Sequence, residues 1–310
     1  MPVASVGQVS TATDPRWPSA ATLVAESPWP ARRNVGLVGV STYLTSVTTR
    51  SWKSTPEAVR EALTKYSTWS EEAGVDLAEH VGLVDYGDVF DPDGESGTAR
   101  VAAHLAQRDE GLDLLLVLGG DNAATYHAFV GLAGEDLASF GLVTLDAHHD
   151  LRDGVSNGSP VRQLLEAGLP GSQVVQVGIA DFANSAQYAA AARDAGVTVI
   201  ARSELRRREV EEVAAAALAV AGAGGRSVYV DVDLDAADRA VVPGCPAALP
   251  GGLSADEVRR FVRAVASDPR VRALDLTEVD VGRDSEDQRT VRLVALCVLE
   301  ALVGVTARAS

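Results

Sequence analysis

Short apolar runs alternate with amphipathic segments from Asn34 to the end of the chain. Runs of four to eight aliphatic and β-branched residues bounded by turn residues are typical of buried strands, and apolar positions three or four residues apart are typical of helices. A helix is predicted to begin at Ser54-Thr55-Pro56-Glu57, because Ser suits the N-cap and Pro the first turn. Further helices are predicted from about Gly97 and over 211–222 and 288–303, and strands at 35–40, 81–86, 112–119, 139–146, 173–179, 197–200, 226–233 and 271–277.

This alternation predicts the fold class. Parallel strands need a crossover connection, which is usually a helix, so alternating strands and helices favour a mainly parallel sheet with helices on its faces. The expected architecture is a single-domain, three-layer α/β/α fold over residues 34–310. Residues 1–33 are rich in Pro, Ser, Thr and Ala without clear periodicity, and they are expected to form an N-terminal arm.

The composition excludes several classes of protein. Of the 310 residues, 46% are hydrophobic and 23% are charged, which is ordinary for a soluble domain with a sizeable core. The formal net charge of -16 argues against binding to nucleic acid or to an anionic membrane surface. Cys245 and Cys297 provide no disulfide framework, and no apolar stretch is long enough to cross a membrane, so a cytoplasmic location is expected.

Polar residues follow four of the predicted strands at their carboxyl ends. In open α/β sheets, ligands bind outside the carboxyl ends of the strands, so these residues are the first candidates for chemistry. The four segments are Asp121-Asn122, Asp146-Ala147-His148-His149-Asp150, Asp231-Val232-Asp233-Leu234-Asp235 and Glu278. Their acids are expected to meet at one edge of the sheet.

The segment 146–150 carries the strongest signal. In an extended chain, Asp146, His148 and Asp150 would point to one face and the residues between them to the other. Carboxylates this close repel one another, and a divalent cation is the usual compensation. The same argument applies to the aspartates of 231–235, and the spacing alone leaves open whether the ligand pair there begins at the first or the second of them.

Four carboxylates facing two divalent ions would balance in charge. Oxygen ligands combined with an imidazole suit Mn²⁺ better than a metal that prefers thiolates. A pair of such ions makes water a stronger nucleophile near neutral pH. The residues therefore predict two-metal hydrolytic chemistry.

Four motifs in this sequence resemble the ureohydrolase family of arginase, agmatinase and formimidoylglutamase. The resemblance covers about residues 34 to 306 and implies an arginase-like fold. It also sets the register, because the family pattern fits only if Asp233, Asp235 and Asp238 are its three aspartates. The motifs are GGDN at 119–122, DAHHD at 146–150, DLDAADRAVVPG at 233–244 and TEVD at 277–280.

The resemblance implies a set of metal ligands. Asp146 and Asp233 would bridge two Mn²⁺ ions, and His148 and Asp235 would complete one site. Asn122 and Asp150 would complete the other site together with the bridging residues. Most family members have His where this chain has Asn122, and an amide oxygen is a poorer donor to Mn²⁺ than imidazole, so this second site is expected to bind its ion more weakly.

The resemblance also implies substrate-binding residues. Glu278 would face the planar amidine or guanidine head group, where a carboxylate offers two acceptors, and Glu278 and Asp150 are the expected catalytic residues. The loop SNGSPVR at 156–162 matches the substrate-tail loop of the family. Its members Asn157, Ser159 and Arg162 are expected to contact the substrate, with Arg239 as a second cation for the tail.

The GGDN variant and the SNGSP loop are features of the formimidoylglutamase branch. The expected reaction is therefore hydrolysis of N-formimidoyl-L-glutamate to L-glutamate and formamide. The alternatives are a guanidino-acid or agmatine-type hydrolase that releases urea, and a binding protein of the same fold with impaired catalysis. The resemblance also implies assembly into a homo-oligomer.

Overall fold

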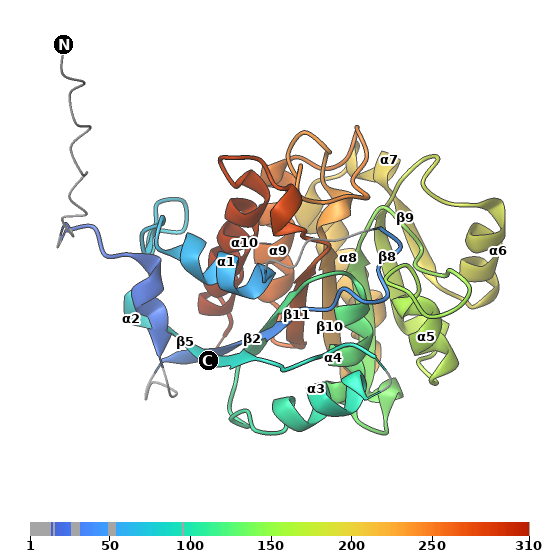
Figure 1. Ribbon diagram of the computed structural model, residues 1–310, viewed down its shortest axis with the longest axis horizontal. Coiled ribbons are helices and arrows are strands. Elements are labelled where there is room, and N and C mark those ends of the chain that lie inside the picture. Colours follow the sequence, from blue (N-terminus) through green and yellow to red (C-terminus); the bar gives the residue numbers. More distant parts are fainter. Residues whose placement is uncertain (1–13, 15, 26–31, 49–53, 95, 310) are drawn as a thin grey trace, which may run out of the picture.

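The computed structural model describes residues 14, 16–25, 32–48, 54–94 and 96–309. Its centre is a nine-stranded parallel sheet with the order β1-β5-β2-β6-β11-β10-β7-β8-β9 (Figure 1). The strands are β1 (Val24–Ala25), β2 (Arg33–Val40), β5 (Val81–Asp88), β6 (Leu114–Gly119), β7 (Phe140–Leu145), β8 (Val174–Ile179), β9 (Thr198–Ala201), β10 (Ser227–Asp233) and β11 (Val271–Thr277).

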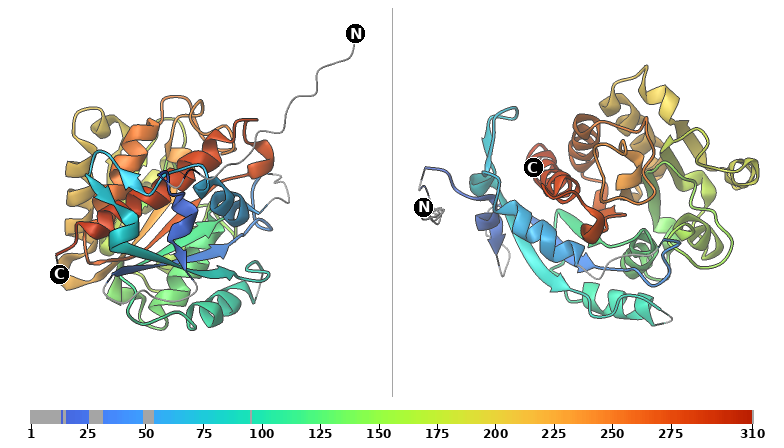
Figure 2. Two further views of the ribbon diagram at one scale, coloured as in Figure 1. Left: turned by 90° about the vertical axis from the view of Figure 1, so that its left-hand side faces the viewer. Right: turned by 45° about the horizontal axis from the view of Figure 1, so that its top comes forward.

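Helices cover both faces of this sheet (Figure 2). The core on one face includes residues of α1 (Thr55–Leu63), α2 (Leu77–His80), α7 (Arg202–Leu205), α8 (Val210–Ala221), α9 (Ala255–Ala266) and α10 (Arg289–Thr306). The core on the other face includes residues of α3 (Gly97–Leu105), α4 (Ala123–Ala133), α5 (Pro160–Glu166) and α6 (Ala186–Asp194). The predicted three-layer α/β/α architecture is confirmed.

The two covered faces explain the sequence pattern of the strands. Every residue of β6 is buried, as expected of a parallel strand that is shielded on both sides. Its side chains divide between the two cores, with Leu114, Leu116 and Leu118 in one and Leu115 and Val117 in the other. Burial of both faces therefore leaves the strand ends as the places where polar groups can gather.

The N-terminal segment also contributes to the sheet. The short strand β1 pairs with β5 at one edge, preceded by a 3-10 helix at Ala20–Leu23. A separate hairpin of β3 (Trp69–Ser70) and β4 (Val75–Asp76) was not expected from the sequence. Much of the predicted arm lies outside the described residues, and its boundary at residue 33 stays a prediction.

The strand order brings the four polar segments together. Strands β6, β11, β10 and β7 are consecutive neighbours in the middle of the sheet. Their carboxyl ends lead directly into Asn122, Glu278, Asp233 and Asp146, which are far apart in the sequence. The crossovers thus deliver all four to one edge of the sheet, where ligands bind in this class of fold.

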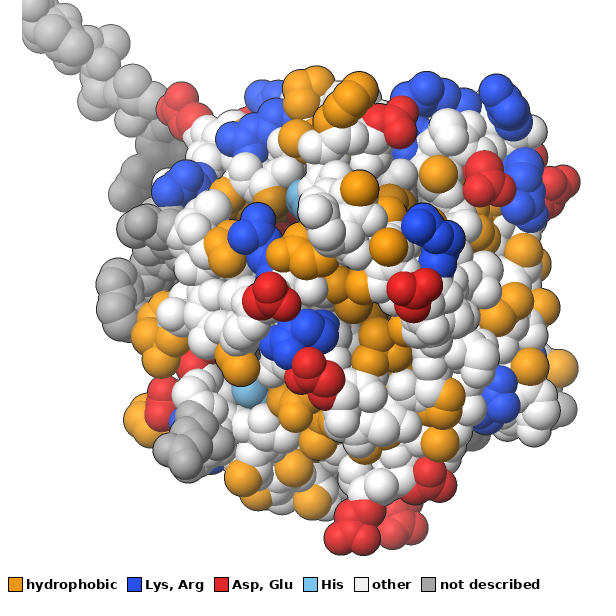
Figure 3. Space-filling view, turned by 90° about the vertical axis from the view of Figure 1, so that its right-hand side faces the viewer, with side chains coloured by type: hydrophobic (Ala, Val, Ile, Leu, Met, Phe, Trp, Pro, Cys, Tyr) orange, Lys and Arg blue, Asp and Glu red, His pale blue; other side chains and the backbone are white. Residues whose placement is uncertain are grey.

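The surface carries both signs of charge. On the face drawn in Figure 3, Lys and Arg side chains are interspersed with Asp and Glu side chains and with apolar groups. Within the described part of the chain, no helix combines the length and the apolar character that crossing a membrane requires.

A half-buried histidine links two helices of one layer. Thr98 Oγ1 of α3 lies 2.8 Å from His127 Nδ1 of α4, with a hydrogen bond between them. Burial lowers the pKa of His127 to about 4, with a smaller contribution from Arg100. Between these two pKa values, the imidazole is neutral in the folded protein and protonated in the unfolded chain.

This difference predicts a loss of stability in acid. Because the pKa of His127 is lowered on folding, the unfolded state binds the proton first as the pH falls from 6.5 toward 4. The loss should be on the order of 3 kcal/mol, and His127→Gln should remove most of it. Urea unfolding between pH 7 and pH 4 measures this, with His80→Gln at an exposed position as the control. Parallel pH profiles for the wild type and His127→Gln would contradict the assignment.

Candidate functional site

The first candidate metal group surrounds His148. Strand β7 ends at Leu145, and the chain then turns so that Asp146 Oδ1 accepts a hydrogen bond from the His148 N–H at 2.6 Å. His148 Nδ1 lies 2.7 Å from Asp235 Oδ2 and 3.6 Å from Asp146 Oδ1. Potential ligand atoms of Asp146, His148 and Asp235 all lie within 4.8 Å of one another. We call these three residues the histidine group.

A second group contains three aspartates and shares one member with the first. Potential ligand atoms of Asp146, Asp150 and Asp233 also lie within 4.8 Å of one another. Asp150 has a φ of 53°, which non-glycine residues rarely adopt, and Asp233 ends strand β10. The Asp233 carboxylate accepts a hydrogen bond from the Asp235 N–H at 2.7 Å, which links the two groups. We call Asp146, Asp150 and Asp233 the aspartate group.

The local conformation differs from the sequence expectation. Residues 146–150 are not an extended continuation of β7, because the strand stops at Leu145. A turn after Asp146 brings its carboxylate to His148. Asp150, in the left-handed conformation, lies beside Asp146 in the other group. Strand alternation is therefore not what places these side chains.

Asp231 lies behind the two groups and belongs to neither. It is fully buried in β10, in register with Thr144 of β7 and Asp275 of β11. Neither of its carboxyl oxygens accepts a hydrogen bond from an N–H or O–H group of the described chain. Burial raises the pKa of Asp231 well above its usual range, and the neighbouring Asp275 raises it further.

Burial of so many acids perturbs their protonation. Burial raises the pKa of Asp146 to about 7, with a further contribution from Asp235, and it raises the pKa values of Asp150 and Asp233 well above their usual range. Burial alone would lower the pKa of His148, but its hydrogen bonds to Asp146 and Asp235 raise it to about 11. Burial acts to raise the pKa of Asp235 as well, but the His148 hydrogen bond outweighs this effect and lowers it.

These residues fit a pair of divalent cations. Asp146 is fully buried, and its Oδ2 accepts no hydrogen bond from the described residues. An anion in that position needs a positive partner, and the shared use of Asp146 by both groups would suit an oxygen bridge between two ions. Carboxylate oxygens with one imidazole match the preferences of Mn²⁺.

Asn122 borders the aspartate group through its amide nitrogen. It is the N-cap residue of α4, and its Nδ2 donates to Asp150 Oδ2 at 2.7 Å. Its Oδ1 accepts hydrogen bonds from Thr125 Oγ1 at 2.7 Å and Thr277 Oγ1 at 2.9 Å. In this arrangement Asn122 orients Asp150, and its oxygen would have to leave both hydroxyl groups to reach a metal ion.

Glu278 is held by two nitrogen donors. Its Oε1 accepts from the Asn122 backbone N–H at 2.9 Å and from Asn157 Nδ2 at 2.7 Å. Asn157 Oδ1 in turn accepts from the Val47 N–H at 2.9 Å. Glu278 also has a φ of 62°, so the chain turns sharply directly after β11. These contacts fix the orientation of the carboxylate that faces the cavity.

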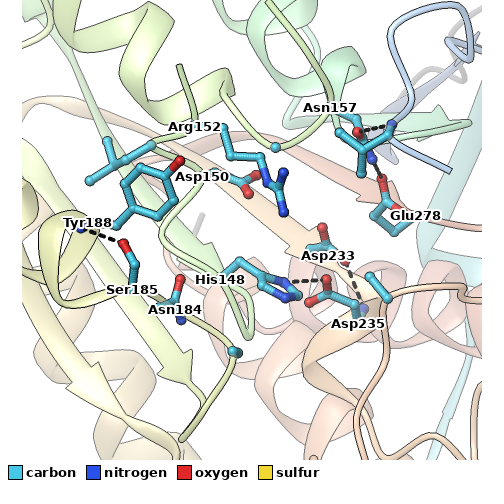
Figure 4. A pocket seen from close by; sticks show the side chains of 15 residues that line it. His148, Asp150, Arg152, Asn157, Asn184, Ser185, Tyr188, Asp233, Asp235 and Glu278 are labelled. Carbon is cyan, nitrogen blue, oxygen red and sulfur yellow. Dashed lines mark hydrogen bonds and ion pairs between the residues drawn. The ribbon is translucent and has the colours of Figure 1, made fainter. Parts of the chain in front are cut away.

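The two groups and Glu278 line one cavity of about 280 Å³ (Figure 4). In Figure 4, Asn157 and Glu278 lie on one side of the cavity, and Tyr188, Ser185 and Asn184 lie on the other. The lining residues are Val47, His148, Asp150, Leu151, Arg152, Asn157, Gly158, Ala183, Asn184, Ser185, Tyr188, Asp233, Asp235, Ala247 and Glu278.

The structure does not bring Ser159, Arg162 or Arg239 to this cavity. Ser159 Oγ closes its own loop by donating to the Ser156 carbonyl at 2.8 Å. The Arg162 guanidinium binds the carbonyl groups of Arg152 and Gly154, and Arg239 binds the carbonyl group of Cys245.

Sequence reasoning missed the wall formed by Arg152, Asn184, Ser185 and Tyr188. Arg152 follows the metal motif by two residues, so its proximity to the site was a usable signal. The other three lie in and beside the first turn of α6, and no motif marked that helix.

Divalent ions should stabilise the fold because they compensate the buried carboxylates. At a Mn²⁺ concentration about 100 times the dissociation constant of a site, each bound ion should raise the free energy of unfolding by about 2.7 kcal/mol, and a chelator should reverse the effect. Asp146→Asn should remove most of the rise because both groups use Asp146, whereas the exposed control Asp136→Asn should retain it. Thermal unfolding with and without Mn²⁺ measures this. An unchanged midpoint in millimolar Mn²⁺ at alkaline pH would rule out the metal assignment.

Known proteins are similar to this chain in sequence and in fold. Residues 33–304 match the arginase family. The formimidoylglutamase of Halalkalibacterium halodurans is 33% identical over 293 residues, which cover 89% of this chain and 89% of that protein. The crystal structure of the Bacillus subtilis formimidoylglutamase has a TM-score of 0.88 at 28% identity, covering 98% of this chain and 97% of that one.

A more distant crystal structure, Trypanosoma cruzi formiminoglutamase with Mn²⁺, shares the fold with a TM-score of 0.81 at 24% identity, covering 94% of this chain and 100% of that one. The predicted arginase-like fold is thereby confirmed. The family match extends over most of the sequence and includes every strand-end segment described above. This chain belongs to the arginase family.

Proposed function

We propose that this chain hydrolyses a formimidoyl C–N bond, converting N-formimidoyl-L-glutamate and water into L-glutamate and formamide. The observation that carries the proposal is the meeting of the histidine group, the aspartate group and Glu278 in one cavity. The similarity to formimidoylglutamases, at 33% identity in one case, supports the choice of head group.

Two Mn²⁺ ions would be held by the histidine group and the aspartate group. When bound, such a pair lowers the pKa of water and stabilises negative charge that develops on the group under attack. The water oxygen adds to the formimidoyl carbon, the bond from that carbon to the glutamate nitrogen breaks, and the departing nitrogen takes a proton. Formamide keeps the former formimidoyl carbon and its terminal nitrogen.

Glu278 would orient the planar cationic head group. A carboxylate can accept two hydrogen bonds from an amidinium, and the charge on both partners strengthens them. The Asn122 backbone N–H and Asn157 Nδ2 hold Glu278 Oε1, so the carboxylate needs no rearrangement when the substrate arrives. Both ends of the Asn157 amide are engaged by the protein, and we therefore assign it to positioning Glu278.

Product analysis tests the reaction. The Mn²⁺-loaded chain should release formamide from N-formimidoyl-L-glutamate, and it should release no urea from agmatine or from guanidino acids of similar length. The same planar head fits Glu278 in both classes, so a guanidino hydrolase is the competing function. Urea from a guanidino acid with no turnover of formimidoylglutamate would establish that alternative, and turnover of neither class would favour a binding protein.

Asn122 predicts unequal affinities for the two ions. Its amide nitrogen faces Asp150, so the aspartate group lacks the imidazole that the histidine group has. Asn122→His should tighten the weaker of the two Mn²⁺ sites on the order of tenfold, which is about 1.4 kcal/mol, because imidazole is the better donor. Titration calorimetry measures both sites, and the tighter one serves as the internal control. Unchanged stoichiometry and affinity would contradict the placement of an ion beside Asn122.

A further inference from the structure

Another cavity, of about 170 Å³, borders the histidine group, and we call it the arginine cavity because Arg202 and Arg206 line it. Asp235 lines both this cavity and the one in Figure 4. The loop between β8 and α6 passes from one cavity to the other, with residues 180–182 at the arginine cavity and 183–185 at the first. A ligand in the arginine cavity would therefore lie close to the proposed metal centre without entering the first cavity.

Arg202 begins α7 and has two buried nitrogen atoms without an acceptor. Its Nη2 donates to the Gly252 carbonyl at 3.0 Å and lies 3.6 Å from Glu257 Oε1. Its Nε and Nη1 are buried, and neither donates a hydrogen bond to the part of the chain that the structure describes. A buried charged donor without an acceptor costs free energy, so an acceptor from outside the chain would stabilise this side chain.

Arg206 adds a second guanidinium to the same cavity. It is the C-cap residue of α7, four residues after Arg202, and side chains at this spacing are neighbours on a helix surface. Arg206 is exposed, and its guanidinium has no hydrogen bond or ion pair with another described residue. Two guanidinium groups that line one cavity repel each other, and an anion between them would replace this repulsion with attraction.

The two acids that line the arginine cavity do not pair with its arginines. Asp235 Oδ1 accepts from the Ala147 N–H at 3.1 Å, and its Oδ2 lies 2.7 Å from His148 Nδ1, so this carboxylate serves the histidine group. Asp181 is exposed, and no ion pair joins it to either arginine in the described structure. Both guanidinium groups therefore keep donors for a ligand.

We propose that the arginine cavity binds a small tetrahedral oxyanion, such as sulfate or a phosphoryl group, and that its occupancy strengthens metal binding at the histidine group. Guanidinium groups match the oxygens of such anions with parallel hydrogen bonds, which the opposite charges strengthen. The anion adds negative charge beside Asp235, and this charge favours a divalent cation at the histidine group. Coupling between two binding sites is reciprocal, so the metal favours the anion to the same degree. This role is independent of the substrate that the chain hydrolyses.

Sulfate binding tests the site directly. The full-length, Mn²⁺-loaded chain should bind sulfate in titration calorimetry at constant ionic strength. Arg202→Gln should weaken this binding by about 10- to 100-fold, because hydrogen bonds from a charged donor are lost, and Arg202→Lys should lose less because it keeps the charge. Arg206→Gln should also weaken it without lowering the midpoint of thermal unfolding, since the exposed guanidinium has no partner in the fold to lose. The matched control is Arg207→Gln, an exposed arginine of the same segment that does not line the cavity, and it should bind sulfate as the wild type does.

Variants of the first cavity separate this site from other places where sulfate could bind. Sulfate could also contact the metal ions or Arg152, but Asp146→Asn and Arg152→Gln should still bind it. Loss of binding in either of these variants, with full binding in Arg202→Gln, would place the anion in the first cavity and overturn the proposal. Unchanged sulfate binding by Arg202→Gln, together with dissociation of an assembly in sedimentation, would assign the arginines to contacts with a second copy and also overturn it.

Mn²⁺ titrations in sulfate and in chloride at equal ionic strength test the coupling. Sulfate should raise the Mn²⁺ affinity by about fivefold, and Arg202→Gln should abolish this rise. Equal Mn²⁺ affinity in both salts would refute the link to the histidine group.

Displacement of sulfate from the metal-free chain distinguishes two sources of the ligand. Tighter binding of glycerol 3-phosphate than of inorganic phosphate would identify the phosphoryl group of a metabolite, and the reverse order would identify a free ion. Failure of both to displace sulfate would overturn the assignment of the cavity to phosphoryl groups.

Discussion

The burial of several carboxylates close together is the constraint on which the rest of this structure depends. Asp146, Asp150, Asp233 and Asp235 lie at the carboxyl edge of a sheet whose two faces are closed by helices. Burial raises the pKa values of Asp146, Asp150 and Asp233, and their proximity to other carboxylates raises them further. Two divalent ions would balance the four carboxylates, with His148 as a neutral ligand. The electrostatic need for cations and the proposed chemistry thus have one origin.

The sheet strands and the carboxylates that follow them could be predicted from the sequence, because both depend on short-range patterns. Parallel strands buried on two faces appear as continuous apolar runs such as Leu114–Gly119, and the residues that follow them are necessarily at one edge of the sheet. The two-residue strands β1, β3 and β4 are too short to show any periodicity, so they were not predicted.

The arginine that lines the cavity was harder to predict for a different reason. Arg152 and Arg162 belong to the same segment and have the same chemistry, so residue type cannot show which one enters the cavity. Arg162 is held by hydrogen bonds to the carbonyl groups of Arg152 and Gly154, whereas Arg152 lines the cavity, and these are tertiary features. The same holds for Asn122, whose amide direction depends on the hydroxyl groups of Thr125 and Thr277.

The order of the central strands has a consequence for how the protein folds. The histidine group and the aspartate group contain residues at the ends of β7 and β10, and Glu278 and Asn122 follow β11 and β6. Asn122 and Glu278 are 156 positions apart in the sequence, and a hydrogen bond joins them. Such long-range contacts form late, because distant segments of the chain must first pair. The nascent chain therefore cannot possess this centre until almost all of its sheet is in place. Ions bound at this centre would therefore be captured late in folding, and their binding would mark its completion.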